Sequence, residues 1–71
     1  MEGSQKLLAA RVRGEFREMP GLCLTIEQAS RLWQVDRLVC EIVLRELVRT
    51  GVLQMTSRGA YVAASLIRER G

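Results

Sequence analysis

Histidine is absent from the 71-residue sequence, and cysteine, proline and aromatic residues are rare. Without histidine the chain lacks the commonest general base, the usual zinc ligand and every Ser-His or Cys-His nucleophile pair. The two cysteines, Cys23 and Cys40, cannot form the several disulfides of small secreted domains, and no metal ligands stand beside them at a suitable spacing. The sequence therefore predicts a cytoplasmic protein that is not an enzyme, with no catalytic residue, metal or cofactor.

Long apolar runs are also missing. Runs such as residues 42–44 are only a few residues long, whereas a membrane span needs roughly 20 and a secretory signal needs an apolar core of ~7–15. The composition, with 48% hydrophobic and 27% charged residues, is typical of a folded globular chain. We expect one domain over residues 1–71, with its core at about 5–64, a polar and basic tail at 65–71, and no membrane partner.

The charge is unevenly distributed along the chain. Ten arginines and one lysine face eight acids, which gives a net charge of +3. Residues 1–20 carry +1, residues 21–50 carry zero and residues 51–71 carry +2. A basic excess favours a polyanionic partner such as nucleic acid. Any such interpretation has to account for the neutral middle segment.

The first 19 residues have the apolar period of a helix. Ser4 is an acceptable N-cap, and the helix is expected to end near Glu18. Gly14 in its middle lowers helix propensity and leaves room for close contact with a neighbouring segment. The predicted buried stripe is Leu8, Val12, Phe16 and Met19.

Two further helices are expected after the Pro20-Gly21 turn and a short edge strand at residues 22–24. Thr25 and Gln28 have the spacing of a capping box, which starts a second helix that ends around Gln34. Its predicted apolar side is Ile26, Ala29, Leu32 and Trp33. Asp36 is the next N-cap, so residues 34–36 form a tight turn, and the layout is helix-turn-helix.

The third helix has a clear buried stripe and a clear end. The stripe consists of Val39, Cys40, Val43, Leu44, Leu47 and Val48. Gly51 stands where a helix commonly ends in a left-handed residue. Residues 52–56 and 60–64 are strand-like and form a β-hairpin with Arg58 near its tip and Tyr61 packed beneath it. The predicted fold class is therefore mainly α with a small antiparallel sheet.

The order helix, short strand, helix, turn, helix, hairpin resembles the winged helix-turn-helix family of DNA-binding domains. Two segments carry the resemblance, LTIEQASRLWQVD at 24–36 and VLRELVRTGVL at 43–53. The first is similar to the second helix and turn of small bacterial regulators, and the second is similar to the end of the recognition helix and its exit into the wing. The resemblance covers roughly residues 5–64 and implies a three-helix winged fold.

The resemblance implies a transcriptional regulator that binds double-stranded DNA, with the third helix in the major groove and the hairpin as the wing. Arg45 is the first choice for a contact to a base edge or a phosphate. Because one such module has a small interface, we expect self-association as a homodimer or larger assembly, and no small-molecule substrate. Carried over by position, the DNA-binding residues are Thr25, Arg37, Leu38, Glu41, Ile42, Arg45, Arg49 and Arg58.

An alternative stays open for the same helix. Glu41 stands four residues from both Arg37 and Arg45, so it can form intrahelical ion pairs with both. Leu38 and Ile42 lie on the solvent side, where they can contact thymine methyl groups or form the centre of a protein interface. The alternative function is therefore a protein–protein interaction or oligomerisation module that uses the Leu38 and Ile42 face.

For the remaining candidate residues a structural role is the expectation. Cys23 and Cys40 are expected to be small core residues with no redox or metal role. Trp33 is expected to pack in the core, since a single aromatic side chain does not form a platform for stacking nucleic-acid bases.

Overall fold

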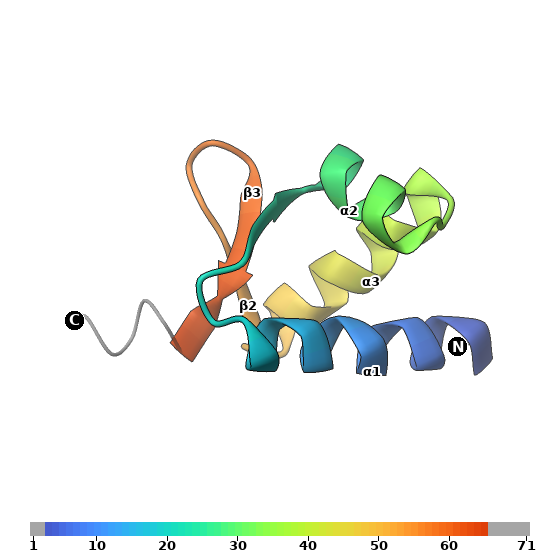
Figure 1. Cartoon of the computed structure of the whole chain (residues 1–71), viewed down its shortest axis with the longest axis horizontal. Helices are drawn as coiled ribbons and strands as arrows, with labels where there is room; N and C mark the ends of the chain where they lie inside the picture. Colours follow the sequence, from blue (N-terminus) through green and yellow to red (C-terminus); the bar gives the residue numbers. More distant parts are fainter. Residues whose placement is uncertain (1–2, 66–71) are drawn as a thin grey trace.

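Three helices and a three-stranded antiparallel sheet make up residues 3–65, the part of the chain that the computed structural model describes (Figure 1). The predicted α+β class is confirmed. The elements follow the order α1 (Gly3–Glu18), β1 (Cys23–Thr25), α2 (Ile26–Trp33), α3 (Arg37–Arg49), β2 (Leu53–Met55) and β3 (Ala60–Ala63). Apart from Ser65, the predicted tail at 65–71 lies outside the described residues.

Helix α1 carries the predicted stripe Leu8, Val12 and Phe16, and all three side chains are buried. Three expectations for this segment are wrong. Ser4 lies inside the helix and is not its N-cap. Met19 follows the helix and is 48% exposed, because the Leu22 N–H donates to the Met19 carbonyl at 2.9 Å and turns the chain away. A Cβ atom added to Gly14 would meet no atom within 4 Å, so no described segment approaches closely there.

Helix α2 begins in the predicted capping box. The Gln28 N–H donates to Thr25 Oγ1 at 3.2 Å, and the Thr25 N–H donates to Gln28 Oε1 at 3.0 Å. Ala29 and Trp33 are buried, as predicted. Leu32 is 53% exposed, against expectation, because it projects about 100° around the helix from Trp33.

Helix α3 also begins and ends as predicted. Asp36 caps it, since its Oδ1 accepts a hydrogen bond from the Leu38 N–H at 2.7 Å. Gly51 follows the helix with a φ of 86°, in the left-handed region that glycine adopts without strain. The predicted stripe faces the core, with Cys40, Val43, Leu44 and Leu47 buried and Val39 and Val48 packed against them.

The sheet has the strand order β1-β3-β2, so β1 is an edge strand and β2 and β3 form the predicted hairpin. Leu24 and Met55 both pair with Tyr61 on the central strand, and Tyr61 is buried as expected. Cys23 is exposed, which corrects the prediction of a core position. Side chains alternate along a strand, so with Leu24 packed on the core Cys23 points to the other side.

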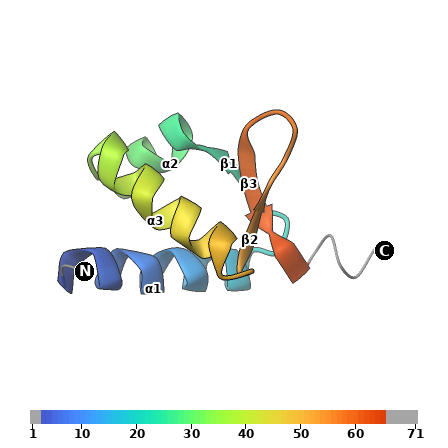
Figure 2. The ribbon, with the colours of Figure 1, turned by 180° about the vertical axis from the view of Figure 1, so that it is seen from behind.

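One apolar core joins the helices to the sheet. It contains Val12 and Phe16 from α1, Leu44 and Leu47 from α3, and Tyr61 from β3. Helix α1 runs along one side of the molecule, and α3 and the hairpin rise from it on the same side of α1 (Figures 1 and 2). Within residues 3–65, no helix is both long enough and apolar enough to cross a bilayer.

Candidate functional site

The outward side of α3 carries six of the eight residues singled out in the sequence. The opposite side of the helix packs on the core. On the outward side, Glu41 is half-buried, and the other five residues are exposed, namely three arginines, Leu38 and Ile42. We call this surface the α3 face, made of Arg37, Leu38, Glu41, Ile42, Arg45 and Arg49. The remaining two residues lie apart from it, Thr25 at the start of α2 and Arg58 at the hairpin tip.

An exposed apolar pair occupies the N-terminal half of the α3 face. Leu38 is 64% exposed and Ile42 is 42% exposed. The two residues are four apart on a helix, which makes them neighbours on its surface. The α3 face is therefore part apolar and part charged.

Each arginine of α3 forms an ion pair with a glutamate. Arg45 Nη1 lies 3.3 Å from Glu41 Oε2, as the spacing predicts. Arg37 Nη1 lies 3.4 Å from Glu27 Oε2 on α2, which corrects the predicted pairing with Glu41. Pairs as exposed as these contribute at most about 1 kcal/mol each, so a competing anion can replace the carboxylate.

The third pair joins Arg49 to Glu46, one turn earlier on the helix. The hydrogen bond from Arg49, assisted by its charge, lowers the pKa of the Glu46 carboxyl. The same hydrogen bond raises the pKa of the Arg49 guanidinium. Both groups are therefore held in their charged forms at neutral pH.

A hollow of about 300 Å³ lies between α3 and the hairpin. Its lining residues are Arg45, Val48, Arg49, Met55 and Tyr61. Met55 is 47% exposed. The sequence predicted only that it lies in a strand and gave no reason to expect it at a functional site. The two guanidiniums thus stand beside a concave surface that continues from the α3 face onto the hairpin.

Burial raises the pKa of the Tyr61 phenol. The nearby Arg45 charge works in the opposite direction, and Glu41 and Cys40 add smaller raising effects. Tyr61 therefore stays protonated well into the alkaline range and presents a neutral aromatic side chain to the hollow. A neutral phenol neither attracts nor repels an anion through net charge.

The hairpin turn holds Arg58 out into solvent. Thr56 Oγ1 accepts hydrogen bonds from the backbone N–H groups of Arg58 and Ala60, at 3.3 and 3.2 Å. Gly59 has a φ of 83°, which completes the turn. Among the described residues no ion pair involves Arg58. Its charge is thus not offset by any described neighbour, unlike the charges of the three arginines on α3.

Thr25 is mainly occupied by its structural role. Its hydroxyl and its N–H are both engaged in the capping box with Gln28. Glu27 in the first turn already complements the positive end of the α2 dipole. The start of α2 is therefore less available to a phosphate than the sequence suggested.

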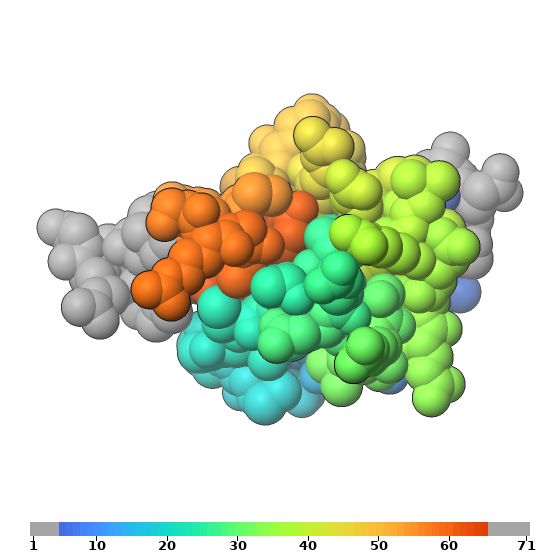
Figure 3. Space-filling view, turned by 90° about the horizontal axis from the view of Figure 1, so that it is seen from above, coloured from blue at the N-terminus to red at the C-terminus, as the bar shows by residue number. Residues whose placement is uncertain are grey.

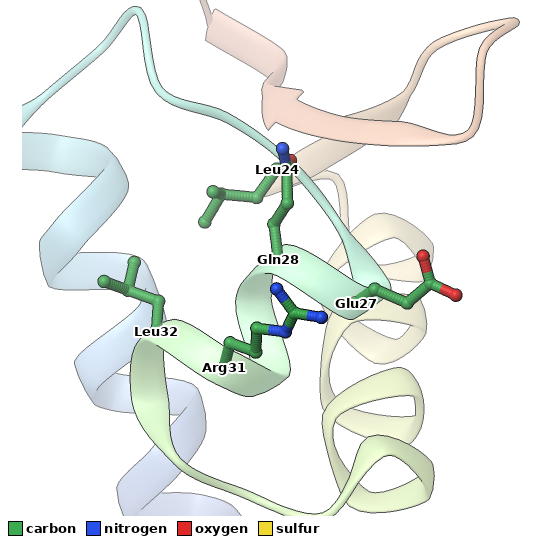
Figure 4. A pocket seen from close by; sticks show the side chains of 5 residues that line it. All are labelled: Leu24, Glu27, Gln28, Arg31 and Leu32. Carbon is green, nitrogen blue, oxygen red and sulfur yellow. The ribbon is translucent and has the colours of Figure 1, made fainter.

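A larger hollow, about 500 Å³, lies on the outer side of α2 (Figure 4). It is lined by Leu24, Glu27, Gln28, Arg31 and Leu32. The Glu27 carboxylate points away from it, and Gln28 reaches back toward the strand in the capping box (Figure 4). Small-molecule sites usually bring several polar groups together in an enclosed cleft, and this open hollow does not.

Comparison with family models, with curated proteins and with solved structures finds no match to this chain. Within residues 3–65, no three cysteine, aspartate or glutamate side chains are grouped so that they could hold a metal ion.

Proposed function

We propose that the chain is a winged helix-turn-helix domain that binds double-stranded DNA in a transcription-regulator setting. In this proposal α3 enters the major groove and the β2–β3 hairpin is the wing. The single observation that supports it most is the combination of the α3 face with an exposed Arg58 at the hairpin tip that forms no ion pair with any described residue. The hairpin, α2 and α3 are visible together on the side of the molecule opposite α1 (Figure 3).

The chemistry of the α3 face fits a duplex. Arg45 can contact a guanine edge or a phosphate, because a guanidinium offers a planar fork of donors to either. Leu38 and Ile42 can contact thymine methyl groups. The ion pairs of Arg37, Arg45 and Arg49 leave the face nearly neutral in the free protein, so DNA has to displace glutamates before it gains the arginine contacts.

A salt-dependent titration tests the proposal. We expect fluorescence anisotropy with a mixed-sequence duplex to detect binding that weakens from about 50 to 200 mM salt, because each phosphate contact contributes about −0.9 to the logarithmic slope. Arg45→Ala and Arg58→Ala should each weaken binding without unfolding the protein. Arg11→Ala on α1 is the matched control, since it removes an exposed arginine that belongs neither to the α3 face nor to the hairpin. Equal affinities for all three variants and the native chain would remove the α3 face and the hairpin from the proposal.

A second candidate function is supported by the apolar pair on α3. With Leu38 64% and Ile42 42% exposed, the α3 face has the exposed apolar centre of a protein interface. In this case the partner is a second copy of the chain or another protein. Leu38→Asp or Ile42→Asp should then abolish self-association in analytical ultracentrifugation while the circular dichroism spectrum stays native. A native chain that sediments as a monomer at all concentrations excludes the homodimer.

A further inference from the structure

A third hollow lies at the base of the hairpin, where α1 meets the sheet. Its volume is about 240 Å³, and among the described residues it is lined by Arg13, Phe16, Arg17, Val52, Ala63 and Ser65. Phe16 and Ala63 are buried and form an apolar floor, whereas the two arginines and Ser65 are exposed. The hollow is therefore lined by two cationic side chains and one hydroxyl group over an apolar floor.

Arg13 and Arg17 form a like-charge pair, since they stand four residues apart on α1. Pairs of like charge at this spacing destabilise a helix. The residues three or four positions away from either arginine within α1 include no acid. No ion pair of Arg13 or Arg17 occurs among the described side chains, whereas every arginine of α3 has one. An anion between the two guanidiniums would relieve their repulsion.

We infer that this hollow binds a phosphate of a DNA backbone, as a second contact surface in addition to the α3 face. Guanidinium groups bind phosphate oxygens through paired hydrogen bonds, and the Ser65 hydroxyl can donate another. The choice of DNA as the ligand rests on the proposed function. Helix α1 lies on the opposite side of the molecule from the hairpin tip (Figure 1). The two surfaces therefore face different directions and suit two segments of duplex.

A nucleic-acid backbone fits this surface better than a bilayer does. A helix that lies on a membrane inserts an apolar face next to its cationic residues. The apolar stripe of α1, which includes Val12 and Phe16, is instead buried in the core. Leu7 is the one large apolar side chain exposed along the described part of α1.

Two double variants with the same charge change test the inference. Arg13→Gln/Arg17→Gln removes the pair at the hollow, and Arg11→Gln/Arg31→Gln removes two exposed arginines elsewhere; each lowers the net charge from +3 to +1. We expect the first variant to make the slope of log affinity against log salt shallower by about 0.9, which corresponds to the one phosphate held between the two guanidiniums. The control should change the slope by clearly less. Circular dichroism spectra of both variants should match that of the native chain, which checks that both fold.

The same titration with Arg45→Ala/Arg58→Ala separates this inference from the proposed function. A shallower slope for the Arg13/Arg17 variant alone supports the hollow and contradicts the α3 face as the DNA-binding site. A loss of affinity for the Arg45/Arg58 variant alone supports the α3 face and the hairpin as the DNA-binding site and contradicts the hollow. Equal effects of the two glutamine double variants, or no binding by the native chain at 50 mM salt, overturn the inference. Binding to vesicles of anionic lipid but not to duplex assigns the hollow to a membrane and overturns it as well.

Discussion

The Nη1 atom of Arg45 lies 3.3 Å from Oε2 of Glu41, one turn earlier on α3. Both side chains belong to the α3 face, so the contact that supports the helix also neutralises the cation on which the proposed DNA binding most depends. The α3 face can therefore be made more or less cationic through Glu41 without changing Arg45 itself.

Glu41→Gln should tighten binding to duplex DNA severalfold at about 50 mM salt. The change frees the Arg45 guanidinium and removes a carboxylate that would repel phosphates. The cost in helix stability should be only about 0.2–0.5 kcal/mol, as is typical of an exposed pair at this spacing. Anisotropy titrations measure the first effect and urea unfolding measures the second.

Glu15→Gln on α1 is the control for this prediction, because it changes the net charge by the same amount and no ion pair of Glu15 occurs among the described residues. If both variants tighten binding equally, the gain reflects overall charge, and Arg45 has no special role in contacting the duplex.

Thr25→Ala should lower the free energy of unfolding by about 1 kcal/mol, within a range of about 0.5–2 kcal/mol. The reason is the capping box, in which the Thr25 hydroxyl accepts from the Gln28 N–H at 3.2 Å. Thr25→Ser keeps an acceptor at the same place and should retain most of the stability. Urea unfolding followed by circular dichroism compares the three proteins. Equal losses in the alanine and serine variants would mean that the methyl group of Thr25, not its hydroxyl, matters.

Trp33→Phe should destabilise the fold by only about 1–2 kcal/mol, although Trp33 is buried with 4% of its surface exposed. Within the described part of the chain, its Nε1 has no hydrogen-bond partner. Phenylalanine loses packing but also removes an unsatisfied buried donor, and these effects partly offset each other. Alanine has no ring to fill the space of the indole, so Trp33→Ala should lower the free energy of unfolding by about 3–5 kcal/mol.

Unfolding of the Trp33 variants has to be followed by circular dichroism, since this is the only tryptophan of the chain. A phenylalanine variant as unstable as the alanine variant would indicate that the indole N–H does have a partner in solution.

The N-caps of α2 and α3 could be predicted from the sequence, unlike that of α1, because they depend on hydrogen bonds between residues two or three apart. The capping box of Thr25 and the cap of Asp36 are examples, and the positive φ of Gly51 follows from the same local reasoning. The buried stripe of α3 and, apart from Met19, that of α1 could also be predicted, since three or four turns of helix define one apolar side clearly.

What the sequence could not predict depends on how the elements pack together. Leu32 lies at the edge of the apolar side of α2. A helix of two turns is too short for periodicity to decide which of its side chains pack on the core. Arg37 pairs with Glu27 across two helices, and this contact overrides the local alternative with Glu41. The hollow at the base of the hairpin joins Arg13, Phe16 and Arg17 to residues 52–65, and the sequence carries no local signal for contacts between segments so far apart.

Tyr61→Phe should make the protein less sensitive to alkaline pH. Burial raises the pKa of Tyr61 above its ordinary value of 10.0. A group whose pKa is raised on folding contributes stability that is fully present below the unfolded pKa and is lost as the pH rises through the folded pKa. The native chain should therefore lose stability above about pH 10, relative to the phenylalanine variant. Burial also raises the pKa of Cys40 from 9.0, but Cys40 is present in both proteins, so its effect cancels in the difference. Urea unfolding of both proteins at pH 7 and at pH 11 measures that difference, and an identical loss in the two proteins would show that Tyr61 ionises as readily in the folded state as in the unfolded state.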